Sequence, residues 1–275
     1  GMVYSGRRIQ DKLPVAIKRV MREKVKRWET VQGYQVPQEI ALMLRCYGHP
    51  GIIKLVDWYE CLDSFILIME RPERAVDLFD YIREIGRVPE KEAARIFKQI
   101  LDAAIHIQNC GVVHRDIKDE NIIINRDTME AKLIDFGCGT LLKDGPYRDF
   151  SGTPEFYPPE WFVDREYYAR TACVWSLGVL LFDMTQGEIP FKQKEKIVEN
   201  KPNYKHHISE NCRNLIQWCM NSNQKQRPTL EAIQMHMWVV LNCLQPNQAY
   251  GSLHPSQDNI SGRMSGHHPR HSAST

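Results

Sequence analysis

Residues 114–121 hold the side chains in this chain that are best suited to chemistry. Asp116 is followed two positions later by Lys118 and five positions later by Asn121, and Asp135-Phe136-Gly137 begins 14 positions after that asparagine. Asn121 and Asp135 offer oxygen ligands for metal ions that accompany the phosphates of a nucleotide. Asp116 could accept or orient the proton of an attacking hydroxyl, and Lys118 could stabilise the transferred phosphoryl charge. Each motif alone is weak, but both in this order indicate a phosphoryl-transfer site.

A second lysine and its partner lie upstream of this site. Residues 1–20 predict a β-hairpin whose second strand, at 15–20, begins with Val-Ala-Ile-Lys and carries Lys18 inward. This quartet is typical of the strand whose lysine contacts the α- and β-phosphates of a nucleotide. A helix is predicted to begin at Pro37, a residue suited to a first turn. Glu39 in that turn is the natural ion-pair partner of Lys18, although alone it would be an ordinary surface glutamate.

Length, charge and cysteine spacing limit the classes of protein to which this chain could belong. The 275 residues with 43% apolar content can bury a large core, and a net charge of only +2 gives no reason to expect nucleic-acid or membrane binding. No apolar run reaches the length of a membrane span and no signal-peptide pattern is present. The eight cysteines contain no C-x-x-C pair, which favours reduced thiols over disulfides or a zinc site. We therefore expect a monomer of the cytoplasm or nucleus.

The order of predicted elements suggests a strand-rich lobe followed by a helical one. Strands are expected at 52–59 and 64–70, a proline-marked linker at 71–73, and helices at 90–110, 171–185, 211–220 and from Thr229. The basic stretch 19–27 is interpreted as a solvated helix or loop face. Residues 245–275 are poor in large apolar side chains and are predicted to be disordered. The histidines there are interpreted as tail composition rather than a metal site.

Several further segments support a family assignment. They are Glu70-Arg71-Pro72-Glu73, Asp77-Leu78-Phe79-Asp80, Asn109-Cys110-Gly111-Val112, Leu133-Ile134-Asp135-Phe136-Gly137, Pro158-Pro159-Glu160-Trp161, Val174-Trp175-Ser176-Leu177-Gly178 and Arg227-Pro228-Thr229. With residues 114–121, they make residues 1–244 resemble a protein kinase catalytic domain, specifically the Pim family of serine/threonine kinases. The resemblance implies an α+β, two-lobed protein-kinase-like fold. Its small antiparallel β lobe would span 1–69, its hinge 70–74 and its larger, mainly helical lobe 75–244.

The resemblance also implies the nucleotide-binding residues. Val3, Ala16, Ile123 and Ile134 would sandwich the adenine of ATP, with Met69 at the back of the pocket. Pro72 has no N–H to donate to the adenine. ATP would therefore make only one linker hydrogen bond, which it donates to the Glu70 carbonyl, at a cost of about 1 kcal/mol relative to two. The implied cofactors are ATP and Mg²⁺.

Substrate choice follows from the same resemblance. Four carboxylates, those of Asp77, Asp80, Asp119 and Glu120, would surround the peptide groove and favour arginine or lysine near the acceptor serine or threonine of a protein substrate. Their alternative interpretation is scattered surface acids. Lys192 and Lys194 follow Ile189-Pro190-Phe191, where Pim relatives carry further acids, so the preference for distal basic residues is left open.

The activation segment would run from Asp135 to Glu160 and support activity without phosphorylation, as in Pim-like kinases. It contains Tyr147, Ser151 and Thr153. Thr153 is expected on the substrate-binding floor, bonded near Asp116 and Lys118. Glu160 is expected to form a buried, structural ion pair with Arg227.

Two departures keep a second function in view. Cys173 stands where most kinases have an aspartate that braces the catalytic loop, although Pim relatives lack that aspartate too. The segment Gly1-Met2-Val3 resembles the end of a Gly-x-Gly-x-x-Gly-x-Val loop, so most of a phosphate-covering loop is absent from this sequence. The chain is thus interpreted as a serine/threonine kinase, with a non-catalytic kinase-fold binding or scaffold protein as the alternative.

Overall fold

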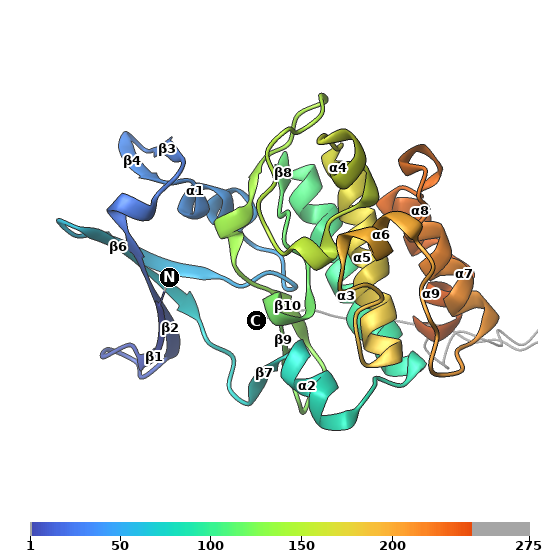
Figure 1. The fold of residues 1–275 in the computed structure, drawn as a ribbon. Coiled ribbons are helices and arrows are strands. Elements are labelled where there is room, and N and C mark those ends of the chain that lie inside the picture. Colours follow the sequence, from blue (N-terminus) through green and yellow to red (C-terminus); the bar gives the residue numbers. More distant parts are fainter. Residues whose placement is uncertain (1, 244–275) are drawn as a thin grey trace, which may run out of the picture. The chain divides into compact units, whose positions relative to one another are not determined.

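The computed structural model describes residues 2–243, and the predicted disordered tail lies outside the described residues. These residues form a lobe of strands and a larger lobe of helices (Figure 1). The expected α+β, two-lobed protein-kinase-like fold, with a small antiparallel sheet and a mainly helical lobe, is confirmed.

The strand-rich lobe is built on a four-stranded antiparallel sheet in the order β1-β2-β6-β5. The strands span Met2–Arg7, Pro14–Met21, Ser64–Glu70 and Leu55–Glu60 for β1, β2, β6 and β5. Val15 and Phe65 are buried, whereas β1 is an exposed edge strand. The predicted hairpin at 1–20 is present as β1 and β2, and it places Lys18 on the inward face of β2.

A strand predicted at 52–59 begins later, because its first residues pair elsewhere. Ile52 forms a parallel bridge with Leu133, and the amide of Ile53 donates to the Leu133 carbonyl at 3.0 Å. The side chains of Ile52 and Ile53 are both buried. The sheet strand β5 therefore starts only at Leu55.

A hairpin and a short helix cover one end of the sheet. The hairpin strands β3 and β4 (Trp28–Val31 and Tyr34–Pro37) were not predicted, and they lead into α1 (Gln38–Arg45). Pro37 does not open the helix as predicted; it precedes it as the N-cap, with an extended ψ of 138°. Glu39 nevertheless falls in the first turn, on the buried side of the helix.

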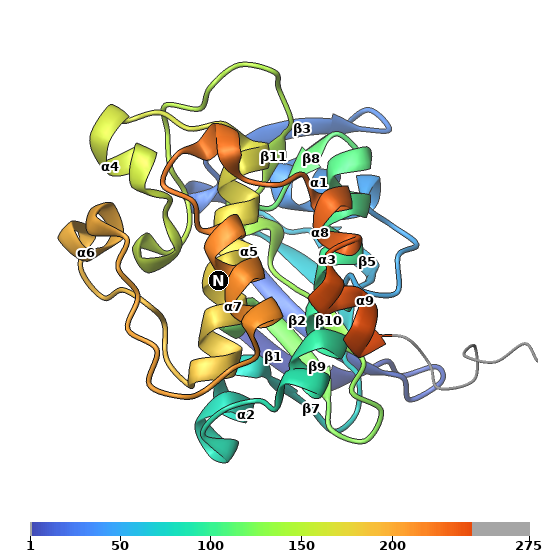
Figure 2. The same ribbon diagram turned by 90° about the vertical axis from the view of Figure 1, so that its right-hand side faces the viewer.

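The helical lobe is organised around α3 (Glu90–Asn109) and α5 (Ala169–Gln186). These helices confirm the patterns expected at 90–110 and 171–185, and α5 is buried along most of its length. α5 packs against both α3 and α7 (Glu210–Cys219), and α7 lies in front of α5 in Figure 2. The remaining helices are α2 (Leu78–Ile85), α4 (Pro159–Asp164), α6 (Lys194–Glu199), α8 (Leu230–Gln234) and α9 (Met237–Cys243). Among the helices of residues 2–243, none combines the length and hydropathy needed to cross a bilayer.

Short strands position the loops that carry the motif residues. β9 (Ile122–Asn125) pairs with β10 (Ala131–Leu133) and with β7 (Ala75–Asp77), while β8 (Val112–Val113) pairs with β11 (Thr140–Leu141). A short 3-10 turn lies in each motif loop: η2 (Asp119–Asn121) between β8 and β9, and η3 (Phe136–Cys138) between β10 and β11. The two motif loops thus leave neighbouring strands and are held side by side.

Candidate active site

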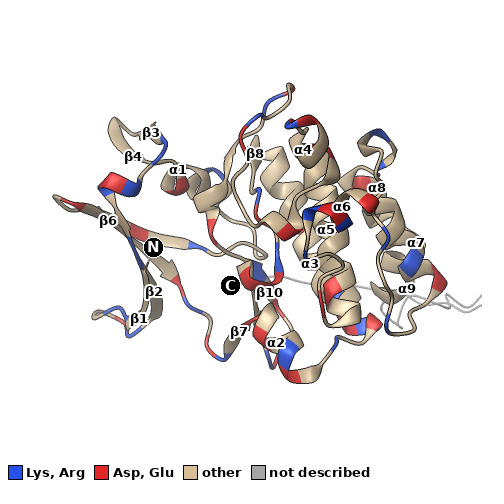
Figure 3. Cartoon of the chain, viewed as in Figure 1, with Lys and Arg blue, Asp and Glu red and all other residues tan. Residues whose placement is uncertain are grey.

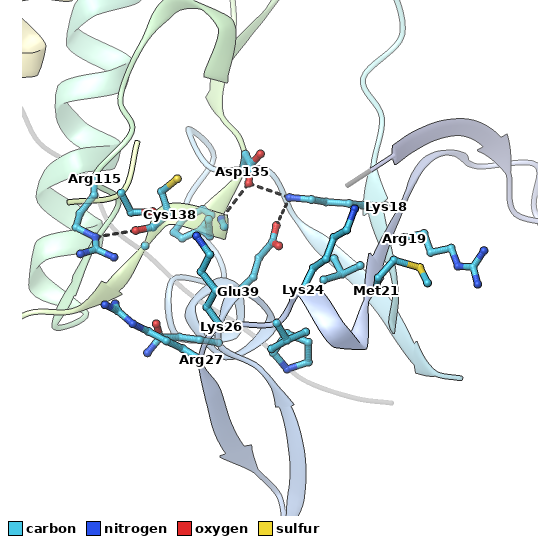
Figure 4. A pocket seen from close by; sticks show the side chains of 18 of the residues that line it. Lys18, Arg19, Met21, Lys24, Lys26, Arg27, Glu39, Arg115, Asp135 and Cys138 are labelled. Carbon is cyan, nitrogen blue, oxygen red and sulfur yellow. Dashed lines mark hydrogen bonds and ion pairs between the residues drawn. The ribbon is translucent and has the colours of Figure 1, made fainter. Parts of the chain in front are cut away.

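Lys18 joins the two lobes through two carboxylates. Its Nζ lies 2.6 Å from Glu39 Oε1 on α1 and 2.8 Å from Asp135 Oδ1, which precedes η3 (Figure 4). The side chains of Lys18 and Glu39 are each 8% exposed, whereas that of Asp135 is 47% exposed. One oxygen of Asp135 therefore holds the lysine while the carboxylate still faces the cavity.

Burial and ion pairing act in opposite directions on the pKa values of this cluster. Burial opposes the charge on Lys18, but Glu39 and Asp135 outweigh it and raise the pKa of the ammonium. Burial likewise opposes ionisation of Asp135, but Lys18 and the Gly137 N–H hold the pKa of that carboxyl below its usual value. Burial raises the pKa of Glu39, and Lys18 counteracts it. A cation placed between two carboxylates is suited to contact phosphate oxygens.

Asp116 is oriented by three hydrogen bonds. Its Oδ1 accepts from the Thr153 N–H and hydroxyl, both at 2.9 Å, and its Oδ2 accepts from Asn121 Nδ2 at 2.8 Å. The expected contact between Thr153 and Asp116 is thus present. Asn121 uses its amide nitrogen twice, because the same Nδ2 also donates to the Asp116 carbonyl at 2.9 Å. The amide oxygen of Asn121 consequently remains an available acceptor.

His114 and Lys118 flank this aspartate. Burial lowers the pKa of His114. The neutral ring fits a network in which Nε2 donates to the Ile134 carbonyl at 2.9 Å and Nδ1 accepts from the Asp116 N–H at 3.3 Å. Lys118 pairs with Glu120. Burial opposes the charge on Lys118, yet Glu120 and Asp116 together raise the pKa of this lysine.

The strand register locates the residues expected around adenine. Val3 is opposite Lys18, and Ala16 is opposite Met69. Because cross-strand partners point to the same face, Val3, Ala16 and Met69 all lie on the Lys18 side of the sheet. Val3 is 58% exposed on the edge strand, while Met69 is buried.

Three further residues, Ile123, Ile134 and Glu70, are expected in the nucleotide site. Ile123 on β9 and Ile134 after β10 are half-buried. Glu70 ends β6, and its side chain accepts from the Lys54 N–H at 2.8 Å and pairs with Lys132 at 3.0 Å.

The four expected substrate carboxylates do not form one group. Asp77 caps α2 by accepting from the Asp80 N–H at 2.7 Å, and Asp80 pairs with Arg83 on the helix surface. Glu120 is exposed and bonded to Lys118. Asp119 differs, because it is 6% exposed and lies against Asp183 of α5.

Two acidic residues beside Asp119 were missed by the sequence reasoning. Asp183 is 4% exposed, and burial followed by the charge of Asp119 raises its pKa to about 8. Glu188 also acts on Asp183, and it pairs with Lys205 at 2.6 Å and Lys192 at 3.5 Å. A carboxylate inside an otherwise apolar helix was the only available signal for Asp183.

A third missed residue is Asp149, which bridges two arginines. Its Oδ2 lies 2.5 Å from Arg27 NH2 and 3.1 Å from Arg115 NH1. Arg115 is the residue before Asp116, and its Nε donates to the Cys138 carbonyl at 2.7 Å. The interpretation of 19–27 as a solvated face is therefore wrong for Arg27, which ties the strand-rich lobe to the activation segment.

Glu160 and Arg227 form the expected buried pair. The two contacts, at 2.8 and 2.7 Å, are bidentate, and the side chains are 5% and 0% exposed. Cys173 borders a small, mostly apolar cavity under the catalytic loop, and burial raises the pKa of its thiol to about 12.

Comparisons with known proteins agree with this geometry. The model of the protein kinase domain matches residues 1–239. The chain is 44% identical over 250 residues to the serine/threonine-protein kinase pim-2 of Danio rerio, covering 87% of this chain and 81% of that protein. It is 40% identical over 246 residues to the serine/threonine-protein kinase prk-2 of Caenorhabditis elegans, covering 87% of this chain and 55% of that protein. These comparisons lead one to expect a paired lysine, an oriented aspartate and an Asp-Phe-Gly carboxylate, and the structure has all three. The chain belongs to the protein kinase family, among its Pim-like members.

Proposed function

We propose that this protein is an ATP- and Mg²⁺-dependent serine/threonine kinase that acts on protein segments with basic residues near the acceptor. The observation that carries the proposal is the presence of two preformed, hydrogen-bonded groups. Lys18, Glu39 and Asp135 form one, and Asp116, Asn121 and Thr153 form the other. Both kinase relatives described above bear serine/threonine-protein kinase names.

The donor atoms suit magnesium and nucleotide phosphates. Asn121 donates with its amide nitrogen, which leaves its oxygen for a metal, and Asp135 bonds Lys18 and Gly137 through Oδ1. Within residues 2–243 there is no cluster of three or more His, Cys, Asp or Glu suited to a metal. One carboxylate, one amide oxygen and phosphate oxygens form a typical magnesium environment. Bound magnesium would neutralise charge that develops on the phosphoryl oxygens.

The remaining roles, phosphate binding and proton transfer, fall to side chains of the protein. Lys18 would hold the α- and β-phosphates, because Glu39 and Asp135 fix its ammonium in the cavity. Asp116 would orient the acceptor hydroxyl and take its proton at Oδ1 or Oδ2. Lys118, beside Asp116, would stabilise charge on the transferred group.

A preference for basic substrates is supported by carboxylates at the end of β7 and on α2, where Figure 3 shows acidic positions on the helix. Asp77, Asp80 and Glu120 are at least partly exposed and could bind a guanidinium or ammonium group. Glu188 is already paired with two lysines, and Asp119 is buried. We therefore expect selection for basic residues close to the acceptor and weaker selection farther away.

Activity without phosphorylation of the activation segment is supported by Asp149. Its carboxylate forms ion pairs with Arg115, which precedes Asp116, and with Arg27, which lies ahead of α1. An acidic side chain there supplies a permanent negative charge of the kind that phosphorylation would otherwise add.

One experiment tests these proposals together. Phosphatase-treated protein is incubated with Mg²⁺-ATP and a serine peptide that carries arginine upstream of the acceptor, and initial rates of phosphate transfer are measured. We expect transfer by the treated protein, at least about tenfold lower kcat/KM for the peptide with its arginines replaced by alanine, and loss of transfer in Asp116→Asn. Equal rates for Asp116→Asn and the unaltered protein would refute the catalytic role. No transfer by either would favour the non-catalytic binding protein.

A further inference from the structure

The loop after α1 packs against one face of α3. A Cβ atom added to Gly51 would lie 3.1 Å from the Gln99 carbonyl oxygen and 3.3 Å from the Ala103 Cβ, so the loop backbone touches the helix. Two residues earlier, the ring of His49 stacks on that of His106, with 4.9 Å between the ring centroids. The three helix residues are spaced by four and three positions and therefore share one face. The loop and α3 run antiparallel along that face.

Two cysteines lie at the end of this contact. Cys46 is the C-cap residue of α1 and Cys110 is the C-cap residue of α3. Cys110 lies four positions after His106 and extends the same helical face, next to the start of the loop. Burial, followed by the charge of the Cys110 thiol and a hydrogen bond with it, raises the pKa of Cys46 to about 12. The two thiols are thus neighbours, and both are free in the structure.

The two thiols differ in their access to solvent and in their contacts. Cys46 is fully buried, whereas Cys110 is half-buried. Cys110 Sγ lies 3.5 Å from His106 Nε2, and an imidazole nitrogen at that position can take the proton of the thiol. The thiolate is the form that reacts with an oxidant. Cys110 is therefore the thiol that an oxidant reaches first, with Cys46 beside it to complete a disulfide.

We propose that Cys46 and Cys110 form a reversible disulfide when the protein meets hydrogen peroxide. First, His106 takes the Cys110 proton and the sulfur bonds to one peroxide oxygen. The O–O bond breaks, and the departing hydroxide recovers the proton from His106 and becomes water. Cys46 Sγ then bonds to the Cys110 sulfur, the S–O bond of the sulfenic acid breaks, and hydroxide leaves with the Cys46 proton as a second water. Two thiols are oxidised to one disulfide, and one peroxide is reduced to two waters.

The disulfide would join the end of α1 to the end of α3. α1 carries Glu39, which pairs with Lys18, so the bond restrains the helix that holds this ion pair. It also closes a loop that runs from α1 through β5, β6 and α2 to the end of α3, and this closure removes conformations from the unfolded chain. The oxidised protein is therefore expected to be more stable and to open less readily at α1. This chemistry does not depend on the proposed phosphate transfer.

The test compares the reduced protein with protein that has been treated with hydrogen peroxide and then freed of it. Remaining thiols are alkylated, and mass spectrometry of peptides prepared without reductant identifies the linked cysteines. We expect a peptide pair joined through Cys46 and Cys110 that dithiothreitol separates. We also expect a Tm about 4–8 °C above that of the reduced protein, and about tenfold slower hydrogen exchange of the α1 amides.

Three variants sharpen this test. Cys46→Ala should abolish the linked peptide and leave Cys110 as a sulfenic acid that a dimedone probe captures. Cys61→Ala removes an exposed cysteine between β5 and β6, and it should form the disulfide as the unaltered protein does. His106→Gln should slow disulfide formation by about tenfold, because the proton acceptor beside Cys110 is lost.

Each part of the inference has an outcome that would overturn it. If Cys110 stays a thiol or stops at the sulfenic acid in the unaltered protein, there is no disulfide. Linked peptides that contain Cys61 and vanish in Cys61→Ala would show a different pairing. A disulfide between Cys46 and Cys110 with unchanged Tm and unchanged α1 exchange would refute the restraint. Formation at an equal rate in His106→Gln would remove the imidazole from the reaction. None of these measurements uses ATP, so the kinase proposal stands or falls separately.

Discussion

Two buried ion pairs in this protein have the same chemistry but different environments. Arg227 and Glu160 form one bidentate pair of two hydrogen bonds, and Arg227 Nε also donates to the Asn221 carbonyl. Almost none of either side chain is exposed. The side chains of Lys18 and Glu39 are also buried, but the third member of their cluster, Asp135, is about half exposed and faces a cavity.

The difference shows how a folded protein separates structure from chemistry. A saturated pair has no capacity left for a ligand, and it can only hold α4 against the segment before α8. The Lys18 cluster includes a carboxylate that is exposed to the cavity, which is why we propose it as the site for phosphate and metal. The following variants test this distinction, from the largest expected effect to the smallest.

The largest effect is expected at the exposed end of the unsaturated cluster. Asp135→Asn removes the charge that would hold a metal while keeping the side-chain shape. Peptide phosphorylation should fall by about 10³-fold or more, equivalent to about 4 kcal/mol of transition-state stabilisation. The Mg²⁺-dependent rise in Tm on adding ATP should also vanish. An unchanged nucleotide-induced shift in this variant would remove Asp135 from the metal site.

The saturated pair should respond in the opposite way. Glu160→Gln leaves the Arg227 charge buried without a counterion, so the free energy of unfolding should fall by about 3 kcal/mol or more. The rate per folded molecule should change less than about twofold, because neither residue lies at the reacting groups. Denaturant titration and initial rates at low temperature measure both quantities. Glu166→Gln, which affects an exposed pair with Arg148, should cost under about 1 kcal/mol. Equal losses in the two variants would contradict the distinction.

Asp183 is a third case to compare with the two ion pairs, because it is buried and has no cationic partner among the described residues. Asp183 Oδ2 has no hydrogen-bond partner in the described part of the chain, and its pKa is raised to about 8 by burial and by Asp119, with Glu188 adding to the effect. A raised carboxyl pKa means that the folded state binds the proton more tightly than the unfolded state. The stabilisation is therefore complete below pH 4 and is lost as pH rises toward 8.

The Asp183→Asn variant should remove this loss. Between pH 6 and 8.5 the unaltered protein should lose about 2–3 kcal/mol more unfolding free energy than the variant. Denaturant titrations at the two pH values measure the difference, with Asp127→Asn as an exposed control. Parallel curves for the protein and Asp183→Asn would show that this carboxyl titrates normally.

Motif spacing predicted the main parts of the fold and site, because those residues act through local loops. The order of Asp116, Lys118, Asn121 and Asp135 predicted which side chains would be used. The structure bonds Asp116 to Asn121, and it bonds Asp135 to Lys18, which also pairs with Glu39. Helical periodicity predicted α3 and α5 within a few residues. By contrast, the strand expected at 52–59 was placed too early, because Ile52 and Ile53 pair with Leu133, which is distant in the sequence.

The sequence by itself determined the kinase family, the strand-then-helix order and the residues of the phosphoryl-transfer motifs. Only the tertiary structure decided which charges meet. It paired Arg27 with Asp149 across 122 positions, buried Asp119 against Asp183, and brought Cys46 next to Cys110. The physical reason is that a motif records residues constrained within one loop. Ion pairing, burial and pKa instead depend on which distant segments the hydrophobic core brings together.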